Sequence, residues 1–439
     1  MLVRAVISVV FVVSVVSPLM GQEPPSPTWS WSARGELKLH YRDTEEARFQ
    51  LRFPFPPETL PPGQSFGFAD TVDPGSHAEV GNVSLTLEGS YGSLFAMRAK
   101  LDGVDLHERN PTSDDRKVDA DELWFRLGPK PEGLSVPDGS TVFLQAGKAP
   151  KIERQPVRML ESYGLASTAF NRLEDVQFLL GGTLGRNVYW RAQVSNGNPV
   201  FSRDPNALAG DNGTDELLRR EAPELGSGFP ILYDADVEDY VFDTSHLEYG
   251  GGLGYRWQRD DASGVDVLLF HYQRELAETV ELEGTFYGGD LDLFDAGGIR
   301  LPFSGNEKVE TGARLYAEWG GLTVVGQHVL QVVAELDRDG SELEIGWELP
   351  FSFGPMVRGD SMVSSIQPAV RASLMDNHFR GPRQFPAPSV WWDWIKYDLG
   401  VRIGLFSRFD LTIERAFHDV DSPVPLDFDE TLVTLRARL

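Results

Sequence analysis

Four basic side chains gather in one short segment of the sequence. Residues 148–158 read Lys-Ala-Pro-Lys-Ile-Glu-Arg-Gln-Pro-Val-Arg, with Glu153 as the only acid. The basic residues are Lys148, Lys151, Arg154 and Arg158. Lysine and arginine side chains around a narrow passage favour anions and phosphates. At the narrowest part of a passage this segment would attract anions, although an ordinary solvated loop has the same composition.

Further basic residues lie on segments in which polar and apolar side chains alternate. These candidates for the wall of a passage are Arg98, Lys100, Arg191, Arg314 and Arg402. Acidic residues at similar positions, among them Glu310 and Glu342, offset part of their charge. The predicted wall is therefore mixed in charge, and the anion preference is expected to come from the basic segment.

A dense aromatic cluster near the end of the chain suggests a second kind of chemistry. Its members are Trp391, Trp392 and Trp394. Indole rings are rigid and largely apolar, so they would stack against the apolar faces of sugar rings. The same residues would also suit an aromatic girdle at a membrane interface, or packing between loops. Both interpretations remain open at this point.

Catalytic, cofactor and metal motifs are not found in the sequence. It has no G-x-S-x-G, H-E-x-x-H or Walker motif. With no cysteine, it offers no thiol nucleophile and no zinc ribbon. The acidic runs in residues 234–239 and 290–292 lack the spacing of an EF-hand. We therefore predict that the protein is not an enzyme and has no cofactor or metal site.

The net charge excludes one class of partner. The chain has 439 residues and a formal charge of −26 at pH 7. Much of the excess acid lies in residues 202–243, 275–306 and 418–429. Because nucleic acids bind basic surfaces, we expect no nucleic-acid partner.

The elements that position these residues are indicated by an alternation of apolar and polar side chains along the sequence. In residues 83–101 and 341–349, apolar and polar side chains alternate, which is the pattern of a β-strand with one face apolar and one polar. About sixteen such segments are found, and their connections mostly alternate between long and short. Two connections, 129–140 and 350–362, are intermediate in length. This pattern predicts an all-β fold: a transmembrane antiparallel β-barrel of about 16 strands, with long extracellular loops and short periplasmic turns.

The first residues have the features of an export signal. Arg4 precedes an apolar stretch, residues 5–16, and a small-residue segment near Gly21 follows. We predict a signal peptide over residues 1–21 and one barrel domain over residues 22–439. The expected location is the outer membrane of a Gram-negative bacterium.

Three motifs resemble a known family. They are Gln145-Ala146-Gly147-Lys148 with the basic segment through Pro156, the strand Glu174–Gly182, and Val188–Ser195 followed by Asn196-Gly197-Asn198. In these motifs the sequence resembles the phosphate-selective porin O/P-type outer-membrane proteins. The resemblance implies a sixteen-stranded trimeric porin whose third loop, here residues 150–174, turns inward and lines an anion path with lysines and arginines.

The sequence thus predicts a porin for passive diffusion of small hydrophilic solutes, with anion selectivity from its third loop. One alternative is a channel for oligosaccharides or acidic sugars that uses the tryptophan cluster. Another is a non-conducting structural or adhesive barrel whose acidic loops bind a partner. Expected partners are outer-membrane lipid and lipopolysaccharide, the transported solutes or anions, and two further copies in a homotrimer.

Overall fold

The computed structural model describes residues 28–51, 67–70, 75–104, 118–131, 133–170, 174–197, 242, 247–260, 262–275, 307–333, 336–378, 393–421 and 426–439. The predicted signal peptide, Trp391 and Trp392 lie outside these residues. Within them, no helix is both long enough and apolar enough to cross a membrane.

The described part of the chain is almost entirely strand. The elements are β1 (Trp29–Thr44), β2 (Arg48–Leu51), β3 (Gly67–Asp70), β4 (Gly75–Tyr91), β5 (Phe95–Val104), β6 (Asp119–Leu127), β7 (Thr141–Pro150), α2 (Leu165–Ala169), β8 (Glu174–Leu184), β9 (Val188–Ser195), β10 (Glu248–Asp260), β11 (Ser263–Glu275), β12 (Glu307–Trp319), β13 (Leu322–Val333), β14 (Leu336–Trp347), β15 (Leu349–Val357), β16 (Asp360–Asn377), β17 (Asp393–Leu405), β18 (Phe409–Asp421) and β19 (Leu426–Arg438).

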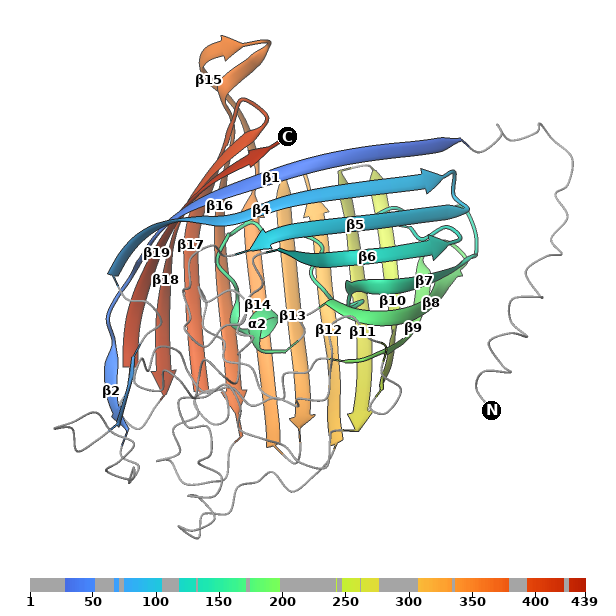
Figure 1. The fold of residues 1–439 in the computed structure, drawn as a ribbon, viewed down its shortest axis with the longest axis horizontal. Coiled ribbons are helices and arrows are strands. Elements are labelled where there is room, and N and C mark those ends of the chain that lie inside the picture. The colour runs from blue at the N-terminus through green and yellow to red at the C-terminus, as the bar shows by residue number, and fades with distance from the viewer. Residues whose placement is uncertain are drawn as a thin grey trace, which may run out of the picture.

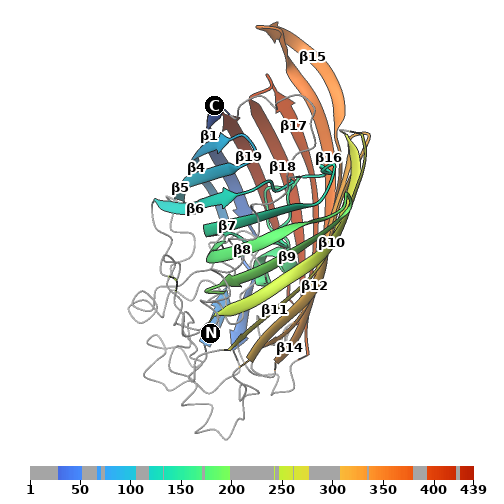
Figure 2. The same ribbon diagram turned by 90° about the vertical axis from the view of Figure 1, so that its right-hand side faces the viewer.

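The strands form a closed antiparallel ring (Figure 1). β1 pairs with β4 on one side and with β19 on the other, so the last strand meets the first. The sheet contains 17 strands. One of them, β15, follows β14 in the chain, pairs only with β16 and projects beyond the barrel wall. The remaining sixteen strands close the barrel, and Figure 2 shows the wall from the side. The predicted fold class is confirmed.

The two faces of the wall explain why these residues form a barrel. On β14, Leu343 points outward and is 45% exposed, whereas the next residue, Glu344, points inward and is 1% exposed. The same alternation recurs on β18, where Ile413 is exposed and Glu414 is buried. An apolar outer face around a charged interior suits lipid outside and water inside, and closure leaves no unpaired strand edge in the bilayer. The protein is therefore an outer-membrane β-barrel, as predicted.

Aromatic side chains mark the ends of the strands with short connections. Trp257 and Trp319 are both exposed and stack with ring centroids 6.3 Å apart. Trp29 and Trp31 stack in the same way at 5.6 Å. Such rings are typical of the girdles at the membrane interface.

One predicted connection is wrong. Residues 350–362, expected to be a loop, belong to the hairpin of β15 and β16, which projects beyond the neighbouring strand ends (Figure 1). Phe351 and Phe353 alternate with Ser352 and Gly354, which is a strand pattern. The proline and glycine residues in this stretch favour a turn and conceal that pattern in the sequence.

The alternation gives a test of which face meets lipid. Replacing the exposed Leu399 of β17 with arginine should lower the free energy of unfolding by about 2–4 kcal/mol, because it places a charge in the bilayer. The matched control is Thr323→Arg on the inner face of β13, where Glu318 lies directly opposite. Urea unfolding in lipid vesicles measures both. Equal effects at the two positions would contradict the assignment of faces.

Candidate functional site

The connection from β7 to β8 lies against the inner face of the barrel. We term its described part, residues 151–170, the inward loop. The backbone N–H groups of Met159 and Leu160 both donate to Glu344 Oε1, at 2.5 and 2.9 Å. The next two N–H groups donate to Glu414 Oε1, each at 3.0 Å. Because both carboxylates are buried in the wall, they hold the loop backbone at a fixed place.

Arg371 of β16 holds the same part of the loop. Its guanidinium donates to the carbonyl oxygen of Ser162 at 3.0 Å and to the hydroxyl oxygen of Ser162 at 2.7 Å. It also pairs with Asp398 at 2.9 Å and with Glu344 at 3.3 Å. The arginine is fully buried, so its charge depends on these partners for stability.

Glu161 anchors the inward loop to the strands β17, β19 and β1. It pairs with Lys38 at 3.0 Å, with Arg402 at 3.2 Å and with Arg436 at 3.4 Å. Burial alone would raise the pKa of Glu161, but the surrounding cations hold it well below its usual range. Arg402 was predicted as a base of the passage wall, and its charge is instead paired with Glu161.

The start of the inward loop is held by a second buried pair. Lys151 Nζ lies 2.5 Å from Glu248 Oε1 of β10 and 4.5 Å from the centre of the Tyr272 ring. Glu153 accepts a hydrogen bond of 2.5 Å from the Tyr272 hydroxyl group. Burial raises the pKa of Glu153 to about 7.

The four bases of segment 148–158 do not form one ring. Lys148 lies on β7 opposite Leu123 and Val176, and Lys151 is buried in its pair. Arg158 stacks over the Tyr163 ring at 4.0 Å. Arg154 pairs with Glu174 and stays half-exposed.

A cavity of about 370 Å³ lies between the inward loop and the wall formed by β5–β12. We call it the inner cavity. Its lining bases are Arg98, Arg126, Lys130, Lys151, Arg154, Arg191, Arg256 and Arg314, and its lining acids are Glu122 and Asp266. Eight bases therefore face two acids. A second cavity of about 620 Å³, the turn-side cavity, adjoins it toward residues 92–93.

Aromatic rings and one acid fix three of these arginines. Arg191 lies 4.8 Å from the ring centres of both Phe143 and Tyr189. Arg256 lies 5.1 Å from the Tyr189 ring and 3.4 Å from Asp266. Arg314 pairs with the same carboxylate at 2.6 Å. A single acid thus serves two arginines, and the group keeps an excess of positive charge.

The other predicted wall bases have different positions. Arg98 lies in the lining of both cavities, 3.3 Å from Glu122. Lys100 is paired with Asp102 at 2.7 Å and Asp121 at 2.6 Å and is not among the lining residues.

Sequence reasoning missed three of the lining bases: Arg126, Arg256 and Lys130. Arg126 alternates with exposed Phe125 and Leu127 in β6, a signal that the pattern does contain. Lys130 lies in a turn, where no periodic pattern indicates direction.

Trp394 does not fit the predicted sugar platform. Its ring is fully buried on β17, donates to His418 Nδ1 at 3.1 Å and packs edge-on against Phe428. No face of this indole is open to a sugar ring.

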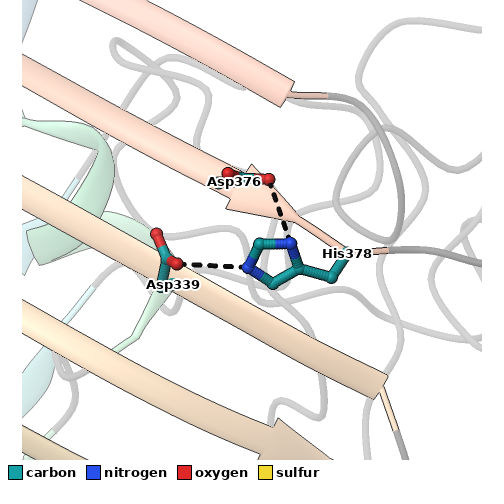
Figure 3. Close-up of side chains that lie close together, drawn as sticks. All are labelled: Asp339, Asp376 and His378. Atoms are coloured by element: carbon teal, nitrogen blue, oxygen red, sulfur yellow. Dashed lines mark hydrogen bonds and ion pairs between the residues drawn. The ribbon is translucent and has the colours of Figure 1, made fainter.

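A histidine and two aspartates meet on the outer face of the barrel, at the end with long connections (Figure 3). His378 lies 3.2 Å from Asp339 and 3.6 Å from Asp376, one carboxylate at each ring nitrogen. The two aspartates lie directly opposite each other on β14 and β16, so like charges would repel. We interpret the imidazole as the group that relieves this repulsion.

The buried arginine gives a stability test. Arg371→Gln should lower the free energy of unfolding by about 3 kcal/mol or more, because it leaves Asp398 buried without its partner. The matched control is Arg415→Gln, which breaks a largely exposed pair with Asp429 and should cost at most about 1 kcal/mol. Denaturant unfolding measures both variants, and similar losses would contradict the anchor.

The raised pKa of Glu153 predicts a pH dependence. A carboxyl group with a folded pKa of about 7 and an ordinary value of 4.5 holds its proton more tightly in the folded state. Its contribution to stability therefore falls as pH rises from 4.5 to about 7. Hydrogen-exchange protection factors of the inward loop should drop over this range, and Glu153→Gln should flatten the drop. An equal drop in the variant would contradict this role.

Neither a protein-family model nor a curated protein sequence matches the chain. Solved structures of similar fold include the anion-selective porin from Comamonas acidovorans, with 10% identity over 94% of this chain and 100% of that chain and a TM-score of 0.46. Salmonella typhi OmpF in complex with daunomycin has 11% identity over 93% and 97%, with a TM-score of 0.48. Outer-membrane expressed OmpT of Vibrio cholerae has 8% identity over 95% and 100%, with a TM-score of 0.46. Likenesses this distant do not by themselves identify a function.

Proposed function

We propose that the protein is an outer-membrane porin through which small hydrophilic solutes diffuse passively, with a preference for anions. The observation that carries this proposal is the lining of the inner cavity, where eight bases face two acids. A charged lining of one sign in a narrow passage selects ions of the other sign.

The position of the bases strengthens their effect. A barrel wall has a lower dielectric constant than water and focuses the field of the charges that line it. The acidic segments 202–243 and 275–306, which lie almost wholly outside the described residues, are predicted to be extracellular loops. Exposed charges act over only about 8 Å in physiological salt. The basic lining is therefore expected to control selectivity.

The lining also favours a class of anion. Six of its eight bases are arginines, whose planar guanidinium groups match the paired oxygens of phosphate and carboxylate groups. This supports transport of oxyanions, in line with the resemblance to phosphate-selective porins. We assign the constriction to the bases that line the inner cavity. Two of them, Lys151 and Arg154, belong to the constriction predicted in the third loop.

The assembly is a separate proposal that rests on the family resemblance. We propose a homotrimer whose outer face contacts lipid and lipopolysaccharide. Cross-linking of the purified protein in native membranes should give a trimeric band, and a monomer alone would contradict it.

The function is tested with two arginines of the inner cavity. The double variant Arg154→Gln/Arg191→Gln should lower the permeability of chloride relative to potassium about fivefold, which corresponds to about 1 kcal/mol of lost attraction. Reversal potentials of single channels in a planar bilayer under a KCl gradient measure this ratio.

The control is Arg259→Gln, an exposed base at the end of β10 that lines neither cavity. It should leave the ratio unchanged. A double variant with the ratio of the unaltered protein would contradict control by the inner cavity. A folded barrel that carries no current would overturn the porin itself.

A further inference from the structure

A second connection also folds into the barrel, at the end with short connections. Residues 128–140, which join β6 to β7, are described except for residue 132, and we term them the re-entrant turn. Arg256 of β10 donates to the carbonyl oxygens of Pro131 and Ser135, at 3.3 and 3.1 Å. The side chain of Arg256, which faces into the barrel, thus holds the backbone of a turn that lies more than a hundred residues earlier in the chain.

The re-entrant turn and the inward loop share one buried apolar cluster. Leu134 is buried in one apolar cluster with Met159 and Leu160 of that loop and with Tyr316 of β12. Burial of the Leu134 side chain favours the inward position of the turn. The two segments therefore enter the barrel from opposite ends and line the same inner cavity.

The turn forms part of the neck between the two cavities. The residues that line both the inner and the turn-side cavity are Arg98, Trp124, Arg126, Lys130 and Pro131. Three of these are bases and none is an acid. A solute that moves from one cavity to the other must pass these side chains, of which Lys130 belongs to the turn itself.

The sequence of the turn restricts its backbone at several positions. Gly128 has a φ of +89°, and a Cβ atom there would lie 2.4 Å from the carbonyl oxygen of Val142. Pro129, Pro131 and Pro137 fix three further φ angles. These prolines favour a fixed position of the turn over a mobile one.

We propose that the re-entrant turn is a second constriction, in series with the inward loop, and that Lys130 is a specificity-determining residue at its neck. This inference rests on the proposed function, because it concerns the same path. The positive charge of the neck selects oxyanions, and the re-entrant turn limits the size of the solutes that pass.

The absence of cysteine from the sequence allows a direct test. Lys130→Cys introduces a single thiol, which a negatively charged methanethiosulfonate reagent modifies by forming a mixed disulfide and releasing methanesulfinate. The added bulk and negative charge at the neck should lower the chloride current about twofold or more. Planar-bilayer recording before and after the reagent measures the change.

The matched control is Arg259→Cys, which places the thiol on an exposed residue outside both cavities. Mass spectrometry confirms modification of each variant, and the control current should stay constant. A fully modified Lys130→Cys channel with unchanged current would overturn the second constriction. An unmodified protein that carries no current would instead overturn the proposed function.

A charge reversal tests the role of Lys130 without any reagent. Lys130→Glu should lower the permeability of chloride relative to potassium about fivefold or more. Arg259→Glu should leave it unchanged. If Lys130→Glu alters neither this ratio nor the conductance, the neck is not a selective site, even if the inner cavity is.

Discussion

The pore depends on two wall carboxylates that accept the backbone of the inward loop. Glu344 and Glu414 each bind two consecutive N–H groups, and Arg371 holds Ser162 between them. A buried charge is stable only when its partners are in place, so the loop and the wall require each other. Together with the ion pairs of Glu161 and Lys151, these contacts fix the position of the loop and the shape of the path beside it.

The same interior uses its charge in two ways. Around the inward loop, acids and bases are held in buried ion pairs, as Glu161 is with Lys38, Arg402 and Arg436. In the lining of the inner cavity, eight bases face two acids. The lining of the inner cavity is therefore basic, whereas the charges that attach the inward loop to β16 and β17 are held in ion pairs.

The fold could be predicted from the sequence and the site only in part. A repeat of two is local, so strands such as β14 could be recognised without knowing their partners. The role of a charged residue depends on distant partners: Lys151 meets Glu248, nearly a hundred residues away, and Trp394 is covered by Phe428. Lys130 could not be found, because only the closed barrel brings its turn inside.

The central claim is that bases inside the barrel, and not the acidic loops, set the selectivity. The most direct measurement is the reversal potential of the unaltered protein in KCl gradients of low and high mean concentration. Exposed charges are screened within about 10 Å at 0.1 M and about 3 Å at 1 M. The account predicts a chloride preference at both concentrations. A potassium preference at low salt that disappears at high salt would contradict it.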